Sequence, residues 1–432
     1  MLTRLDLRGV ADLAASLPAP AADDEPRDAA RALIREVREG GDGALRAITR
    51  RFDGCDVEDP RVSPATMVDA LANAEPAFRA ALHHAETSIR EYHEAQVQPA
   101  PAARDRDGIT VWERDLAVER AGCYVPGGRA AYPSTVLMTV IPAQVAGVRE
   151  IVLCAPPGPG GEIAAPTLAA AEHLGVAEVY RIGGAQAIAA LTYGTETIRP
   201  VDVIVGPGNA YVSAAKREVF GTVGIDSLAG PSEVVIVCDG SVPAEFVAAD
   251  LLAQAEHGPG GTVVLVTWER EVADAVDAEL ERQVVGLDRA DDARATIDSG
   301  GRALLVDGPI EAMLVANAVA PEHLQLMTAD PHSLLDHVRN AGAVFLGPWA
   351  PAALGDYVAG VNHVLPTART ARFASALRVD TFRKHVHVVE ATAAGLAGVA
   401  EHIGALADAE GLDAHANSIE LRRTAALARE RR

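Results

Sequence analysis

The spacing of hydrophobic and polar residues predicts helices toward both ends of the chain. Ala-rich stretches with charges at helical spacing, such as Arg27–Arg38 and Ala70–Ala95, indicate that residues 20–120 are mostly helical. Within them, the polar, Pro-containing segment Pro99–Gly108 predicts a loop. From about Val388 onward apolar residues again recur at spacings of three and four, so the C-terminal segment is also predicted to be helical.

The middle of the chain has a different pattern, in which short runs of β-branched residues alternate with Ala-rich stretches. This alternation is typical of βαβ units and of a mainly parallel sheet. The predicted strands are Glu150–Cys154, Glu178–Ile182, Val201–Val205, Glu233–Val237, Thr262–Val266, Ala303–Val306 and Ala343–Leu346. They fall into two α/β blocks that meet near residue 235, so the sequence predicts an α/β fold with helical ends.

The composition is that of a globular protein with more than one domain. The chain has 432 residues, of which 49% are hydrophobic and 23% charged, and domains average about 150 residues. No apolar run approaches the roughly 18 residues of a membrane helix, and Met1–Val10 lacks the apolar stretch of a signal peptide. A formal charge of −22 without a basic face argues against a nucleic-acid partner.

The four cysteines indicate the compartment. Cys55, Cys123, Cys154 and Cys238 are far apart and form no CxxC pair. They therefore favour neither a disulfide framework nor a thiolate zinc site. We expect a reducing, cytoplasmic location.

Two predicted strands run into glycine turns that are followed by helices. These turns are Arg181–Gln186 and Val205–Tyr211. A strand, a glycine turn and a helix N-terminus together present free backbone N–H groups that can bind phosphate. Neither turn fits G-x-G-x-x-G, because Tyr211 stands where the last glycine would be, so each turn, taken alone, is better explained as a tight turn between elements than as a phosphate site. The richer glycine segment Gly158–Gly161 is flanked by prolines and predicts a surface loop.

Polar residues also gather in two short segments with acid–base or ligating side chains. Gln254 and His257 close a helix that begins near Pro243, about 60° apart at the edge of its apolar stripe. Polar groups in such a place are paired with each other or bound to something else. Glu322 and His323 are adjacent and point different ways, so in a loop they could supply two separate acid–base groups. The alternative is an exposed glutamate beside a capping histidine.

The last two clusters follow later in the chain. Gly355–His363 is punctuated by glycine and therefore loop-like, and within it Asp356 and His363 are possible metal or substrate ligands. Glu410 and His415 lie in the C-terminal helical region, where a lone histidine is usually an exposed residue without a specific role. Each cluster is weak evidence alone, but the set is more specific.

Together these segments resemble the histidinol dehydrogenase family from about residue 30 to residue 422. The matching phrases, in chain order, are YVPGGRAAYPSTVLM (124–138), YRIGGAQAIAAL (180–191), VDVIVGPGNAYV (201–212), AGPSEV (229–234), DLLAQAEH (250–257), APEHLQL (320–326) and GDYVAGVNHVLPT (355–367). So many phrases in one order make a chance likeness implausible.

The resemblance implies roles for individual residues. One zinc ion per subunit would be held by Gln254, His257, Asp356 and His415. Three of these offer the N and O donors that suit zinc, and Gln254 is an unusual fourth ligand. His323 would be the base toward the alcohol and later toward the aldehyde hydrate, and Glu322 would activate the water. The implied substrate contacts are Ser232, Gln254, His257, His323, Asp356, His363, Glu410 and His415, and the implied NAD contacts are Tyr124, Gln186 and Asn209.

The resemblance also implies a reaction and an architecture. The reaction is the four-electron oxidation of L-histidinol through L-histidinaldehyde to L-histidine with two NAD⁺, at the end of histidine biosynthesis. The fold would be two incomplete Rossmann-like domains, one discontinuous over 23–122 and 232–378 and one over 123–231. A helical tail over 379–432 would be exchanged in an intertwined homodimer, so that Glu410 and His415 complete the partner's site.

Departures from the family pattern concern loop shape. Arg369 stands where LPTxGxAR has glycine, Trp349-Ala-Pro replaces a common Ser-Pro-Glu, and Gln144 replaces a common lysine. A paralogous dehydrogenase for another polar alcohol should lose Glu410, His415 and His363, and all three are present. A decayed, non-catalytic binding protein would tolerate loss of Glu322 or His323, and both are present.

Overall fold

The computed structural model describes residues 1–17, 26–127, 130–258 and 260–430. They form two compact units, one of Met1–Gln96 with Val118–Phe382 and one of Val97–Ala117 with Arg383–Arg432. The expected domain start at residue 23 lies outside the described residues. No helix in the described part of the chain is long and apolar enough to cross a membrane. The four cysteines are buried with free thiols.

The first unit contains a parallel six-stranded sheet in the order β1-β11-β10-β9-β12-β13. Its strands are β1 (Thr3–Asp6), β9 (Glu233–Cys238), β10 (Thr262–Thr267), β11 (Gly301–Leu305), β12 (His323–Met327) and β13 (Ala343–Leu346). The four strands predicted in this block are confirmed, whereas β1 and β12 were not predicted. Both additions are short and interrupted by polar residues.

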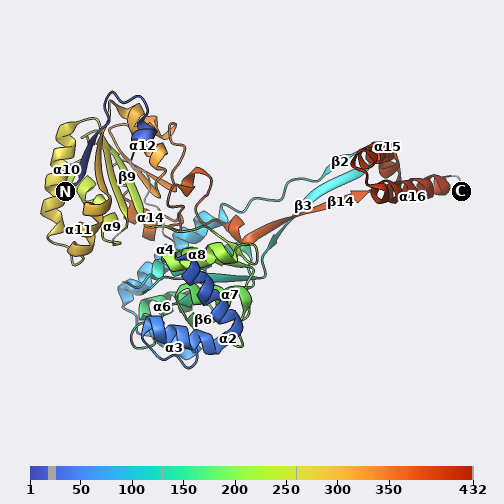
Figure 1. The fold of residues 1–432 in the computed structure, drawn as a ribbon, viewed down its shortest axis with the longest axis horizontal. Coiled ribbons are helices and arrows are strands. Elements are labelled where there is room, and N and C mark those ends of the chain that lie inside the picture. The colour runs from blue at the N-terminus through green and yellow to red at the C-terminus, as the bar shows by residue number, and fades with distance from the viewer. Residues whose placement is uncertain (18–25, 128–129, 259, 431–432) are drawn as a thin grey trace. The chain divides into compact units, whose positions relative to one another are not determined.

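Helices cover both faces of this sheet because successive strand residues point to opposite faces. Val234 and Ile236 pack with α9 (Ala244–Ala255), α10 (Arg270–Val284) and α11 (Ala290–Gly300), whereas Val235 and Val237 pack with α1 (Leu13–Ser16), α12 (Pro309–Val319) and α13 (Pro331–Leu335). Figure 1 shows α9, α10 and α11 along one side of the sheet and α12 on the other.

The same unit contains a parallel five-stranded sheet in the order β6-β5-β4-β7-β8. Its strands are β4 (Arg120–Tyr124), β5 (Glu150–Ala155), β6 (Glu178–Arg181), β7 (Val203–Val205) and β8 (Gly224–Ile225). The three strands predicted here, β5, β6 and β7, are confirmed. Its helices are α2 (Arg27–Asp53), α3 (Pro64–Ala72), α4 (Pro76–Glu94), α5 (Pro133–Ala146), α6 (Ala165–His173), α7 (Gly184–Tyr193) and α8 (Ala210–Val219).

The N-terminal helices pack differently from the expected grouping. We expected residues 23–122 to join residues 232–378, but α2 packs on α7 and α8, α3 on α6, and α4 on α5. The buried stripe of α2, which includes Leu33, Val37 and Ile48, shares one apolar core with the five-stranded sheet. An amphipathic stripe needs an apolar face, but its spacing does not say which of two sheets offers that face.

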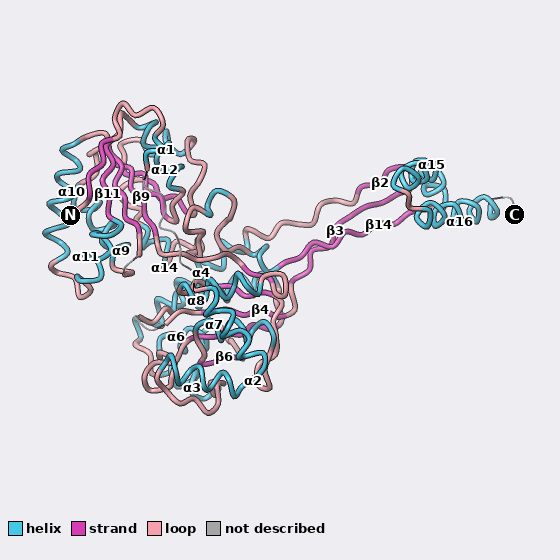
Figure 2. Tube along the Cα trace, viewed as in Figure 1, coloured by secondary structure: helices cyan, strands magenta, loops and turns pink. Residues whose placement is uncertain are grey.

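The second unit combines an antiparallel sheet with two helices. The sheet order is β14-β3-β2, made of β2 (Arg104–Arg106), β3 (Ile109–Ala117) and β14 (Arg383–Ala391). The helices are α15 (Ala393–Glu410) and α16 (Asp413–Glu430), and Figure 2 shows this unit's strands in magenta and helices in cyan. The prediction of helix from about Val388 is confirmed from Ala393 onward.

Two expectations for this unit were wrong. Pro99–Gly108 is not all loop, because it contains β2, and residues 379–432 are not all helical, because β14 precedes α15. β14 pairs with β3 over nine residues, from Arg383 opposite Ala117 to Ala391 opposite Ile109. Charged and apolar residues mix along both strands, so neither shows a buried-strand pattern, and the pairing joins segments more than 260 residues apart.

The remaining short elements lie in the first unit. They are α14 (Ala352–Tyr357) and two 3₁₀ turns, Thr370–Arg372 and Val379–Phe382. The segment Gly355–His363, expected to be loop-like, is therefore helical over its first three residues and irregular afterwards.

Candidate active site

The expected acid–base pair lies at the edge of the six-stranded sheet where its strands begin. His323 is the first residue of β12 and pairs with Val234, the second residue of the parallel strand β9. Placing His323 in a loop was therefore wrong, because buried Gln325 interrupts the apolar run by which the strand could be recognised. Two strand starts lie side by side here, which brings together Ser232, Glu233, Glu322 and His323.

The imidazole of His323 is buried and contacts groups on both of its nitrogens. Nδ1 lies 3.2 Å from the carbonyl oxygen of Glu233 and 3.6 Å from Oε2 of Glu322. Nε2 lies 3.6 Å from Oδ1 of Asp356, which is beyond hydrogen-bond length, and has no hydrogen-bond partner in the described part of the chain. A proton on Nδ1 would be held by the Glu233 carbonyl, which leaves Nε2 to exchange a proton with a ligand.

Glu322 and His323 influence each other's protonation. Burial raises the pKa of the Glu322 carboxyl, although the Glu233 backbone N–H donates to its Oε2 over 3.0 Å. Burial opposes the charged form of His323, but the carboxylates of Glu322 and Asp356 outweigh it and raise the pKa of His323 to about 9. The pair is thus a coupled acid and base shielded from water.

Asp356 stands at the centre of the polar cluster. Burial disfavours its charge, but the close approach of the His323 imidazolium prevails, so the pKa of Asp356 is lowered. Burial lowers the pKa values of His257 and His363. The nearby charge of Asp356 opposes this effect for both histidines without overcoming it. Two neutral imidazoles near one carboxylate are groups that can bind a divalent cation.

The helix α9 places its predicted residues as expected. It begins after Pro243, and Gln254 and His257 lie at its C-terminal end. Gln254 is buried, and its Nε2 has no hydrogen-bond partner in the described part of the chain. An orphaned buried amide three residues before His257 fits a site completed by a bound group, because unpaired buried polar atoms are costly.

His363 is held from two elements, so its ring is fixed. Its Nδ1 lies 3.0 Å from the carbonyl oxygen of Asp356, and its Nε2 lies 3.2 Å from the hydroxyl of Thr135 on α5. Because both nitrogens already have protein partners, His363 is better suited to shape the pocket than to bind a metal.

The three residues expected to contact NAD follow the carboxyl ends of strands in the five-stranded sheet. Tyr124 ends β4, Gln186 lies in the first turn of α7 after β6, and Asn209 caps α8 after β7. The Tyr124 hydroxyl accepts a hydrogen bond from the Gly184 N–H over 3.1 Å, which links the first two sites. Asn209 Oδ1 accepts from the N–H groups of Tyr211 and Val212, so a ligand would meet its amide nitrogen.

The strand order places these residues where parallel sheets of this kind bind ligands. The chain order along the sheet reverses at β4, which lies between β5 and β7. Ligands of open parallel sheets bind outside the carboxyl ends at such a reversal. Both glycine turns are confirmed as turns between a strand and a helix.

Residues outside the sequence motifs stabilise this edge of the five-stranded sheet. Lys216 of α8 and Asp226 form a buried ion pair, and each also binds the backbone of Gly206, through the carbonyl and the N–H respectively. Gly206 has φ +113°, and a Cβ there would lie 2.0 Å from the Tyr124 carbonyl oxygen. The only signal for this pair was a lysine on the apolar face of an Ala-rich helix. Glu233 gave no signal beyond its place at the start of a strand.

Glu410 and His415 belong to the second unit. Glu410 is the last residue of α15, and His415 lies near the start of α16; both side chains are exposed within the single chain.

Comparison with known proteins decides the family. The model of the family described as histidinol dehydrogenase matches residues 19–423. A histidinol dehydrogenase of Bacillus licheniformis is 48% identical over 399 residues, which cover 92% of this chain and 94% of the relative. One from Synechococcus is 49% identical over 394 residues, 91% of each chain. The chain belongs to the histidinol dehydrogenase family.

Solved structures agree with this membership. The crystal structure of histidinol dehydrogenase from Elizabethkingia anophelis matches with a TM-score of 0.92 and 34% identity and covers 98% of both chains. An acetylating aldehyde dehydrogenase from Geobacillus thermoglucosidasius matches with a TM-score of 0.50 and 13% identity over 85% of this chain and 95% of that one. The second likeness concerns the fold alone.

One departure from the family phrase LPTxGxAR has a backbone explanation. Arg369, which replaces the glycine, has φ +64°, and Ala368 before it has φ +51°. Left-handed backbone favours glycine at such a position. The chain therefore keeps the left-handed conformation of a glycine site with an arginine, and the Thr370–Arg372 turn follows it directly.

Proposed function

We propose that this chain oxidises L-histidinol through L-histidinaldehyde to L-histidine and transfers two hydrides to two NAD⁺. The observation that carries the proposal is the buried Glu322–His323 pair with an unpartnered Nε2 facing Asp356 in the described part of the chain. Membership of the histidinol dehydrogenase family supports the identity of the substrate.

His323 is the base in both oxidations. In the first, Nε2 takes the hydroxyl proton of the alcohol while hydride leaves its carbon for NAD⁺. Glu322 then takes a proton from the water that adds to the aldehyde, while His323 returns its proton to the aldehyde oxygen. Nε2 is thereby free to take a hydroxyl proton of the hydrate as the second hydride leaves for the second NAD⁺. The Glu233 carbonyl oxygen fixes the Nδ1 tautomer throughout.

One zinc ion per subunit is part of the proposal, held by Gln254, His257 and Asp356 together with His415. When bound, zinc acts as a template for the imidazole and amine of histidinol. Asp356 ceases to favour the imidazolium form of His323 once a cation neutralises its carboxylate. A cation held by Asp356 would therefore oppose the charged form of His323 and favour the neutral imidazole that accepts a proton.

We also propose that NAD binds at the five-stranded sheet. Tyr124, Gln186 and Asn209 are the proposed contacts, and the reversal of chain order at β4 supports a Rossmann-like half domain. The N-termini of α7 and α8 follow β6 and β7, and the positive ends of their helix dipoles would favour the anionic phosphates of the cofactor.

The last part is an intertwined homodimer in which the second unit completes the partner's site. Glu410 and His415 would then meet the substrate and zinc of the other subunit, so the dimer would be obligatory for activity. Their exposure within the single chain suits residues that act across an interface.

The test of the reaction is stoichiometric. Purified protein with zinc should form two NADH per histidinol consumed and release histidine. A steady ratio of one NADH with free aldehyde would refute the complete oxidation.

Two variant experiments test the assignments. His323→Asn should lower turnover by orders of magnitude and leave bound zinc near the wild-type level, because His323 is not a proposed ligand. Subunits carrying His415→Ala, mixed with subunits carrying Glu322→Gln and His323→Asn, should regain activity. Verified heterodimers without any recovery would contradict shared sites.

A further inference from the structure

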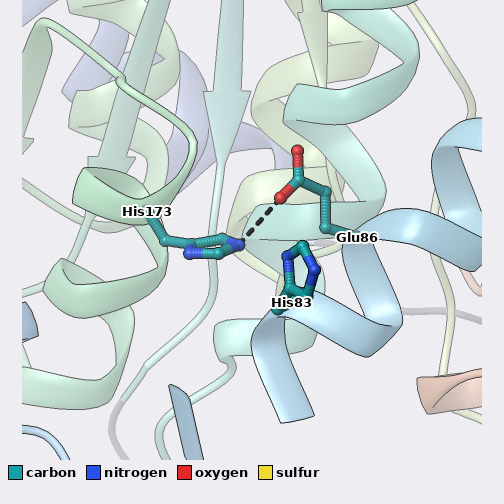
Figure 3. A group of neighbouring side chains, drawn as sticks. All are labelled: His83, Glu86 and His173. Carbon is teal, nitrogen blue, oxygen red and sulfur yellow. Dashed lines mark ion pairs between the residues drawn. The ribbon is translucent and has the colours of Figure 1, made fainter. Parts of the chain in front are cut away.

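A second group of metal-binding side chains lies on the helices outside the five-stranded sheet. His83 and Glu86 are three residues apart on α4, so they share one face of that helix. His173 is the last residue of α6. Figure 3 shows the two histidine rings and the Glu86 carboxylate gathered at one point between the helices.

The distances suit a single small cation. One ligand atom from each of the three residues lies within 4.8 Å of the other two. Ligands at about 2.0–2.1 Å from tetrahedral zinc lie about 3.3 Å apart. Rotation of the exposed His83 side chain and a small separation of Glu86 from His173, now 2.8 Å apart, would meet that geometry.

The contact between Glu86 and His173 is close without being a good hydrogen bond. Nε2 of His173 is buried and has no aligned hydrogen-bond partner in the described part of the chain, although Oε2 of Glu86 is 2.8 Å away. A lone pair on this nitrogen would therefore be available to a cation. A simple ion pair between the two residues would instead place a proton on the line between them.

Glu86 is already held in a way that leaves one oxygen for a metal. Its Oε1 binds Nη2 of Arg90 over 2.9 Å, and its Oε2 is the atom that faces His173. Arg90 is in turn fixed by Gln144, which accepts its N–H over 2.8 Å and donates to the Leu174 carbonyl. Such an outer partner orients a ligating carboxylate without using the coordinating oxygen.

We propose that His83, Glu86 and His173 form a second cation site for Zn²⁺ or a similar borderline divalent ion. Two imidazoles and one carboxylate are a known zinc ligand set, and water would fill the remaining position. The site crosslinks α4 to α6, and none of its residues belongs to the proposed catalytic centre. Its role is to tie the helical layer together, so it is independent of the oxidation itself.

The test counts bound Zn²⁺ by equilibrium dialysis of the full-length protein. Wild-type protein should hold two ions per subunit, and His83→Ala and His173→Ala should each hold one. Each variant should bind the second ion at least about 100-fold more weakly, because loss of even an outer partner costs about 10–100-fold. His84→Ala is the matched control, since His84 is the exposed neighbour on α4 and lies outside the cluster.

A second control addresses the other three-residue cluster in the described part of the chain, Glu113, Asp115 and His385. His385→Ala should leave two bound ions. Thermal unfolding gives an independent readout, because Zn²⁺ in excess should raise the midpoint more in wild type and His84→Ala than in His173→Ala. The same number of bound ions in wild type, His83→Ala and His173→Ala would overturn the proposal, whatever the occupancy of the catalytic centre.

Discussion

Replacing Glu233 with glutamine should stabilise the protein at pH 8 and have little effect at pH 5. Glu233 lies at the start of β9, and its Oε2 is buried without a hydrogen-bond partner in the described part of the chain. Burial, assisted by the nearby charge of Glu322, raises the pKa of Glu233 from 4.5 to about 7. Glutamine keeps the shape and the acceptor for the Ala368 N–H but carries no charge.

The sign follows from proton binding in the two states. Below pH 4.5 the Glu233 carboxyl is protonated in both the folded and the unfolded chain, so its raised pKa costs nothing. Between pH 4.5 and 7 the unfolded chain releases the proton and the folded chain retains it, so stability falls as the pH rises. Above pH 7 the loss is complete.

The magnitude follows from the same two pKa values. Their difference, 7 − 4.5, is 2.5, which corresponds to about 3.4 kcal/mol at about 1.36 kcal/mol per pH unit. The cost of the ionisable group is then about 0.8 kcal/mol at pH 5 and about 3.3 kcal/mol at pH 8. Glu233→Gln should therefore gain about 2.5 kcal/mol more at pH 8 than at pH 5.

The assay is urea unfolding of wild type and variant at both pH values, at one protein concentration and with a chelator present. Glu245→Gln is the control, because Glu245 is an exposed carboxylate at the start of α9. It should show the same small effect at both pH values. An equal gain for Glu233→Gln at pH 5 and pH 8, or destabilisation at pH 8, would refute the reasoning.

Two further predictions concern residues that stabilise the edge of the five-stranded sheet at which NAD is proposed to bind. Lys216→Met breaks a buried ion pair and should cost about 3–5 kcal/mol in denaturant unfolding, whereas Lys216→Met with Asp226→Leu should recover much of it; equal loss in the single and double variants would contradict the charge argument. Gly206→Ala places a Cβ 2.0 Å from the Tyr124 carbonyl oxygen and should both destabilise the protein and raise the KM for NAD⁺. Gly221→Ala, with φ +99° but no atom within 4 Å, should cost only about 1 kcal/mol and leave KM unchanged.

Local sequence pattern accounts for much of the fold. The seven strands predicted from β-branched runs are all present, because a buried parallel strand must be apolar on both faces. The two glycine turns and the end of α9 were also predictable, since they depend on neighbours in the sequence. Three of those strands, β5, β6 and β7, lie in the five-stranded sheet, whose N-terminal helices were expected to pack on the other sheet.

The candidate site was predictable as a set of residues and not as an arrangement. The phrases around Gln254, Glu322 and Asp356 identify the family, but no spacing shows that β12 begins beside β9. That adjacency, joining residues about 90 apart, is what puts the Glu233 carbonyl against His323. Glu233 itself could not be found, because its buried surroundings come from other segments.

The order of amino acids is thus enough to specify the type of most long elements, the succession of the α/β units and the candidate reacting groups. Tertiary contacts alone establish that α2 covers the five-stranded sheet, that β1 joins β11, and that β14 pairs with β3. Periodicity specifies which face of an element is apolar, whereas the partner of that face depends on contacts between distant segments. The pKa values of His323 and Glu233 are likewise decided by the tertiary structure, because burial and neighbouring charges exist only after the chain has folded.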